Sequence, residues 1–113
     1  MIDLDGKTFG IVANSENGEV STDTLFYYKQ DGELVTAKYY GGTIKYGKII
    51  AKFDGDKNLE MLYQCLTDDG ELKAGNANAK VSINSNNKIQ LDLNWQWLNG
   101  DKTSGTSTYV EIG

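Results

Sequence analysis

Hydrophobic and polar positions alternate with a period of two from residue 89 to residue 97. The odd positions carry large apolar side chains, whereas the even positions carry Gln, Asp or Asn. Because successive side chains of a β-strand point to opposite faces of a sheet, this pattern predicts a strand with one buried face. The apolar set includes both tryptophans of the chain, so neighbouring strands must leave room for them: Ile89, Leu91, Leu93, Trp95 and Trp97.

Shorter runs with the same alternation fill most of the remaining chain. Glycines beside Asp or Asn separate these runs and proline is absent, which is typical of consecutive β-hairpins. An open sheet would leave two unprotected edges, so the last strand is expected to pair with the first. The predicted fold is all-β, a single domain over residues 1–113 that forms an antiparallel up-and-down β-barrel of about eight strands with little or no helix. The strands are expected at residues 8–13, 22–30, 33–40, 44–53, 59–66, between 70 and 84, at 89–97 and at 104–112.

Two glycine turns predict which side chains of the second, third and fourth strands point inward. One is a two-residue turn at Asp31-Gly32 and the other a two-residue turn at Gly41-Gly42, and each fixes the pairing of the strands that it joins. Gly47 interrupts the alternation and is expected to form a bulge or bend. The expected inner pairs are Tyr28 with Val35, Phe26 with Ala37, Thr24 with Tyr39, Tyr39 with Ile44, and Ala37 with Tyr46.

A third turn, Asp68-Asp69-Gly70 with its glycine in the left-handed region, predicts the partners of the tryptophan strand. Counting outward from it places small residues beside large ones, so that a glycine separates two large rings. Cys65 is also expected inside, and Lys80 opposite Asp92 outside. The expected rows are Tyr63 with Gly75 and Trp97, Met61 with Ala77 and Trp95, and Leu59 with Ala79 and Leu93.

The two terminal strands complete the expected barrel. The first strand is expected to present Phe9, Ile11 and Ala13 on one face and to be followed by a turn at Asn17-Gly18. The last strand is expected to present Thr106, Thr108, Val110 and Ile112 inward. This leaves several apolar side chains on the outer surface, which predicts a patch for protein contact: Leu25, Tyr27, Leu62, Leu66 and Tyr109.

Composition and charge narrow the classes of function. The chain has no histidine, which removes the commonest general base and metal ligand, so no catalytic residue, metal site or cofactor is expected. A net charge of −5 with no arginine argues against nucleic acid and anionic membranes as partners. The single Cys65 cannot form an internal disulfide, and the first residues do not resemble a signal peptide, so a cytoplasmic location is expected.

Two motif matches fail on their context. Residues 42–48 match the first seven positions of a phosphate-binding loop, but Ile49 replaces the magnesium-binding hydroxyl and no helix is expected to follow. Residues 54–58 begin like a calcium loop, but Leu59 replaces the required glycine and Cys65 the bidentate glutamate. Both segments are interpreted as ordinary hairpin sequence.

The aromatic side chains expected inside the barrel are the best candidates for a binding site. Buried tyrosine hydroxyls and indole N–H groups need hydrogen-bond partners, and two interpretations remain open. The aromatic rings either fill a small barrel completely or line a pocket for a small, partly apolar ligand at one rim. The second interpretation predicts a monomer or homodimer with ligand-binding residues Tyr39, Tyr46, Tyr63, Trp95 and Trp97.

Several motifs are spread along the chain: Tyr40-Gly41-Gly42 with Ile44 and Gly47, Tyr63-Gln64, Gly70-Glu71-Leu72 with Gly75, Trp95-Gln96-Trp97, Gly100-Asp101 and Ser104-Gly105. Together they resemble a family of small bacterial proteins that are often labelled N-acetylglutamate synthase. The resemblance covers nearly the whole chain and implies a barrel related in shape to lipocalins or avidin. The acetyltransferase label is not matched by the residues, because Leu72 stands where the cofactor-binding turn before Gly75 requires Gln or Arg and no helix follows.

Overall fold

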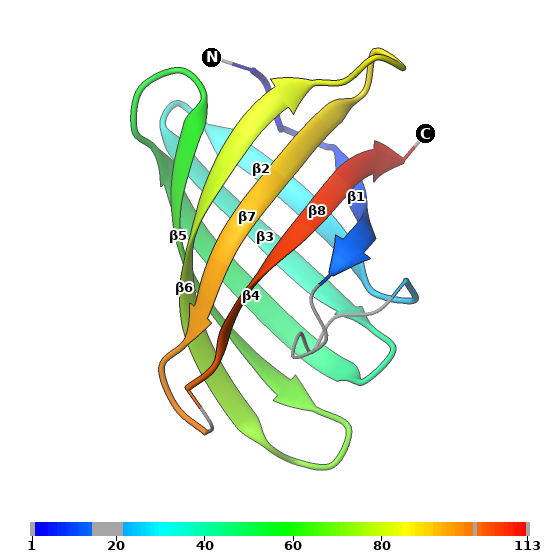
Figure 1. Cartoon of the computed structure of the whole chain (residues 1–113), viewed down its shortest axis with the longest axis vertical. Coiled ribbons are helices and arrows are strands. Elements are labelled where there is room, and N and C mark those ends of the chain that lie inside the picture. Colours follow the sequence, from blue (N-terminus) through cyan, green and yellow to red (C-terminus); the bar gives the residue numbers. More distant parts are fainter. Residues whose placement is uncertain (1, 15–21, 101, 113) are drawn as a thin grey trace.

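A computed structural model describes residues 2–14, 22–100 and 102–112. Over these residues the chain forms eight β-strands and no helix (Figure 1). Each strand pairs antiparallel with the next, and β8 pairs with β1, so the sheet closes into the predicted up-and-down barrel. The strands are β1 (Thr8–Asn14), β2 (Leu25–Asp31), β3 (Leu34–Gly41), β4 (Ile44–Phe53), β5 (Asn58–Thr67), β6 (Leu72–Ile83), β7 (Ile89–Trp97) and β8 (Ser104–Ile112).

Aromatic rings fill much of the barrel interior. Phe26 lies at the centre of one group, with its ring centroid 4.8 Å from that of Tyr39 and 4.8 Å from that of Tyr109. Phe9 and Tyr28 form a second, edge-to-face pair at 5.1 Å. Such pairs add about 0.5–1.5 kcal/mol each beyond the area that they bury. Ring packing therefore adds to the stability that the buried aliphatic side chains of the interior provide.

The predicted pairing around the tryptophan strand is confirmed. Gly70 adopts φ 85°, and the turn that it completes places Tyr63 opposite Gly75. Gly75 in turn pairs with Trp97, and the loop at 84–88 leaves Lys80 opposite Asp92. A methyl group added at Gly75 would lie 2.5 Å from the Tyr63 hydroxyl and 2.5 Å from the Gln96 carbonyl oxygen. Only glycine therefore fits between these two strands.

The two turns that flank β3 differ from the prediction by one position. Asp31 pairs with Leu34 and Gly41 pairs with Ile44, so each two-residue turn begins with a glycine, at Gly32 and Gly42. These glycines have φ 61° and 62°, and glycine at the first central position is the signature of a type II′ turn. Between β2 and β3 the pairing moves by two residues, so Phe26 and Tyr28 still face inward.

The prediction that Tyr46 points into the barrel is wrong. Ile44 is buried, but the pairing of β4 shifts between Ile44 and Tyr46, and Tyr46 is 45% exposed on the outer surface. The bulge lies one residue before the position expected, because Gly47 itself faces inward under the ring of Tyr39. A methyl group on Gly47 would lie 2.3 Å from Cζ of that ring, so the glycine is required by packing.

The inward face of β8 is also opposite to the prediction. Leu91 pairs with Tyr109 and Trp95 pairs with Gly105, so Ser107 and Tyr109 are buried. The residues expected inside are instead exposed or half-buried: Thr106, Thr108, Val110 and Ile112. In β1, Phe9 and Ile11 are buried, but a pairing irregularity before Ala13 leaves Ala13 exposed. The predicted turn at residues 17–18 lies outside the described residues.

Candidate functional site

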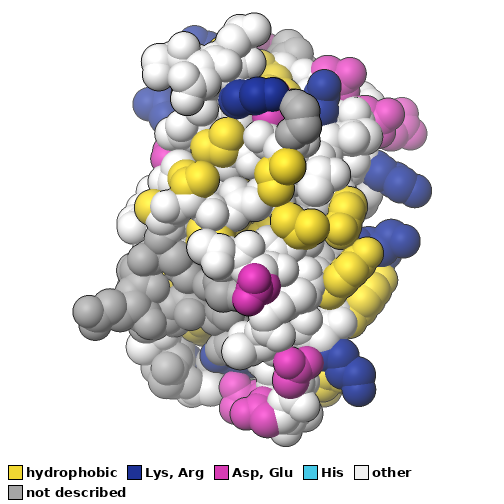
Figure 2. Space-filling view, turned by 90° about the vertical axis from the view of Figure 1, so that its right-hand side faces the viewer, with side chains coloured by type: hydrophobic (Ala, Val, Ile, Leu, Met, Phe, Trp, Pro, Cys, Tyr) yellow, Lys and Arg dark blue, Asp and Glu magenta, His cyan; other side chains and the backbone are white. Residues whose placement is uncertain are grey.

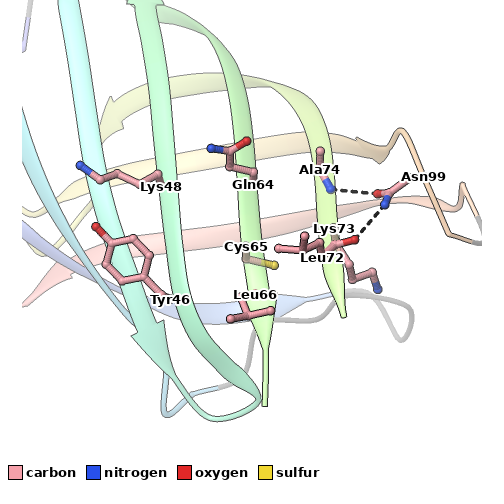
Figure 3. A pocket seen from close by; sticks show the side chains of 9 residues that line it. All are labelled: Tyr46, Lys48, Gln64, Cys65, Leu66, Leu72, Lys73, Ala74 and Asn99. Atoms are coloured by element: carbon pink, nitrogen blue, oxygen red, sulfur yellow. Dashed lines mark hydrogen bonds between the residues drawn. The ribbon is translucent and has the colours of Figure 1, made fainter. Parts of the chain in front are cut away.

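Three turns lie together at the lower end of the barrel in Figure 1. The Asp68 backbone N–H donates to the Thr43 carbonyl at 2.9 Å, which ties the β5–β6 turn to the β3–β4 turn. Asn99, after β7, accepts from the Ala74 N–H at 2.9 Å and donates to the Leu72 carbonyl at 2.8 Å (Figure 3). We call this end of the barrel the rim, and these hydrogen bonds hold its turns in place.

Three aromatic side chains from β5 and β7 meet near the rim, and we call them the rim cluster: Tyr63, Trp95 and Trp97. The ring centroids of Tyr63 and Trp97 are 5.4 Å apart at 75°, and those of Trp95 and Trp97 are 6.0 Å apart. Gly75 of β6 lies between Tyr63 and Trp97 and leaves space for both rings. The sequence correctly predicted this juxtaposition.

The two indole N–H groups of the rim cluster differ in their partners. Trp95 Nε1 donates to the Ser107 hydroxyl at 2.8 Å. Trp97 is only 4% exposed, and its buried Nε1 has no hydrogen-bond partner within the described residues. A buried donor without a partner is unfavourable by about 1–3 kcal/mol. An acceptor placed against Nε1 would remove this penalty.

Lys73 also belongs to this site, and the sequence analysis missed it. Its side chain is 11% exposed, and Nζ lies 4.6 Å from the centre of the Trp97 ring and 3.7 Å from a carboxylate oxygen of Glu71. The alternation that places Gly75 inside places Lys73 on the same face of β6. The alternation of β6 is thus the signal in the sequence that identifies this inward positive charge.

Tyr39 belongs to the group of buried aromatic rings around Phe26. Its ring is stacked on Phe26, and its hydroxyl donates to the Gln64 carbonyl at 3.3 Å. Burial and the neighbouring Cys65 thiol raise the pKa of Tyr39 far above its ordinary value. Burial likewise raises the pKa of Tyr63, so both hydroxyls are neutral hydrogen-bonding groups and not bases at physiological pH.

Tyr46, the remaining predicted ligand-binding residue, lies on the outer surface. It lines a pocket of about 330 Å³ with Lys48, Leu66 and Leu72, on strands β4 to β6. Figure 3 shows these side chains spread along neighbouring strands. The structure therefore brings together the rings of Tyr63, Trp95 and Trp97, stacks the buried Tyr39 ring on Phe26, and places Tyr46 on the outer surface.

The described residues contain no group of three or more His, Cys, Asp or Glu arranged to hold a metal ion. They also contain no helix that is long and apolar enough to cross a membrane.

Comparison with known proteins supports the fold. A family model described as "Avidin-like protein" matches residues 2–112. Neither the curated proteins nor the solved structures include a significant match.

Proposed function

This chain belongs to the avidin-like protein family, and from that premise we propose that it binds a small, partly apolar molecule at the rim. The observation that carries the proposal is the buried N–H of Trp97, which has no partner within the described residues. A ligand acceptor placed against Nε1 would supply the missing hydrogen bond. The neighbouring rings of Tyr63 and Trp95 would cover the apolar part of the ligand.

The dimensions of the barrel agree with a single small ligand. An eight-stranded barrel is just wide enough either to be filled by side chains or to hold one such molecule. Tyr63 is half-buried and Lys73 covers one face of the Trp97 ring, so these two side chains stand between Trp97 and solvent. Entry of a ligand therefore requires Tyr63 or Lys73 to move.

A screen of small metabolites tests the proposal, with the unfolding temperature and tryptophan fluorescence as readouts. We expect at least one compound to raise the unfolding temperature and to change the fluorescence. Trp97→Phe should abolish its binding, because phenylalanine lacks the indole donor. Tyr46→Phe, on the outer surface, is the matched aromatic control and should bind as the unchanged protein does. Binding that survives Trp97→Phe would contradict the assignment.

A second candidate function, a protein-interaction module, has support on the outer surface. Ile50 and Leu62 lie directly opposite each other on β4 and β5 and are 64% and 62% exposed, and Leu72 on β6 is also exposed. Of the apolar patch expected from the sequence, Tyr109 is buried, so that part of the prediction is wrong. Sedimentation should show self-association that Leu62→Glu weakens, and a strict monomer at high concentration would argue against self-association.

A further inference from the structure

The outer surface of β2, β3 and β4 combines lysines with exposed tyrosines. A shallow groove of about 840 Å³ crosses this surface from the residues before β1 to β4. In a side view of the barrel, lysines border hydrophobic side chains along the right-hand edge (Figure 2). We call this surface the lysine–tyrosine face. The residues of the groove that define it are Lys7, Tyr27, Lys29, Lys38, Tyr40, Tyr46 and Lys48.

The charge of this face is opposite to that of the protein. Four lysines line the groove but only one acidic residue, Asp5, whereas the whole chain has a net charge of −5. Within residues 2–14, 22–100 and 102–112, none of these four lysines forms an ion pair. Lys38 and Lys48 lie directly opposite each other on β3 and β4. Like charges in that position destabilise a sheet, so folding alone does not account for them.

The tyrosines of the face provide flat, accessible rings. Tyr27 and Tyr40 stack with centroids 5.4 Å apart and an interplanar angle of 29°, and they are 36% and 46% exposed. Tyr46, raised outward by the bulge in β4, adds a third exposed ring beside Lys48. The arrangement therefore places aromatic platforms next to positive charges along neighbouring strands.

We propose that the lysine–tyrosine face binds a short segment of single-stranded nucleic acid. Bases can stack on the tyrosine rings while the lysines neutralise phosphates, which is the combination that single-strand binding requires. Acidic polymers without rings would use the lysines but not the tyrosines. The acidic residues elsewhere on the barrel do not prevent this, because charges more than about 8–10 Å away are largely screened at physiological salt.

Fluorescence anisotropy with a labelled ten-nucleotide oligothymidine at low salt tests this proposal. We expect Lys38→Gln combined with Lys48→Gln to weaken binding at least tenfold. The slope of log affinity against log salt should become shallower by about 1.4, the value for two lost phosphate contacts on a single strand. Tyr40→Leu, which keeps apolar bulk but removes the stacking ring, should weaken binding about fivefold or more.

Lys57→Gln combined with Lys80→Gln is the matched control, because it changes the net charge equally at two lysines outside the groove. This control should stay within twofold of the unchanged protein, and thermal melts establish that each variant is folded. Absence of binding by the unchanged protein, or equal weakening by both double variants, would overturn the proposal. So would equal affinity for polyglutamate or for a single thymidine nucleotide.

Discussion

At the scale of single residues, inward-facing glycines decide where the large rings lie. Gly47 lies beneath Tyr39, and Gly75 lies between Tyr63 and Trp97. Neither glycine has a positive φ, so neither is required by backbone conformation. Their role is to leave space on the inner face for an aromatic side chain of a neighbouring strand.

Gly47→Ala should therefore destabilise the barrel by overpacking. The new methyl group would lie 2.3–2.5 Å from three atoms of the Tyr39 ring, which is itself stacked on Phe26 and cannot easily shift. We expect a loss of about 1–3 kcal/mol in the free energy of unfolding, measured by urea denaturation.

Gly10→Ala is the matched control for this change. Its methyl group would meet mainly the terminal Cδ1 of Ile112 at 2.8 Å, and that side chain is exposed and free to rotate away. The free energy of unfolding is therefore expected to fall less in Gly10→Ala than in Gly47→Ala. Equal losses at the two positions would show that ring packing over Gly47 is not the cause.

At the scale of strands, Lys38 and Lys48 face each other on β3 and β4, and their like charges lower the free energy of unfolding. Lys38→Glu would replace a like-charge pair with an attractive pair opposite Lys48. We expect this variant to be more stable by about 0.2–1 kcal/mol. Lys80→Glu is the opposite case, because it would place a glutamate opposite Asp92. The free energy of unfolding of this variant should fall by a similar amount. Urea denaturation of both variants checks the signs, and destabilisation by Lys38→Glu would contradict the argument.

The strand scale also explains which predictions from the sequence succeeded. The β5–β6–β7 pairing followed correctly because a three-residue turn ending in Gly70 and a row of small residues both indicated it. Tyr46 was misplaced because a bulge changes the facing of one residue without any change in composition. The face of β8 was misjudged because its alternating Thr, Ser, Tyr and Val side chains suit either surface.

At the scale of the whole molecule, buried tyrosines should make the barrel sensitive to alkaline pH. Burial raises the pKa of Tyr109 to about 12 and raises the pKa of Tyr28 and Tyr39 further. Their unfolded forms ionise near pH 10, so the folded state binds more protons above that pH. Stability contributed by these groups is fully present below pH 10 and declines as the pH rises toward 12.

Urea denaturation at several pH values between 9 and 11.5 measures this decline. Each buried tyrosine makes the free energy of unfolding fall by up to about 1.4 kcal/mol per pH unit in this range. Tyr28→Phe should make the slope shallower, because it removes one group that ionises only in the unfolded chain. A free energy of unfolding that stays constant from pH 9.5 to 11.5 would contradict the account.

The proposed rim site could be predicted from the sequence only in part. The aromatic members of the rim cluster followed from alternation and turn geometry. That the Trp97 N–H has no hydrogen-bond partner within the described residues could not be predicted, because it depends on the positions of the side chains around it. The lysine–tyrosine face could not be predicted from the net charge of −5, because an overall charge does not show how charges are distributed over a surface.

The most direct test of the proposed rim site uses the two indole N–H signals in a ¹H–¹⁵N correlation spectrum, assigned with Trp97→Phe. A compound that binds at the rim should move the Trp97 indole signal downfield and slow its hydrogen exchange, because Nε1 gains an acceptor. The Trp95 signal, already bonded to Ser107, should move much less. A bound compound that leaves the Trp97 indole signal unchanged would contradict the account.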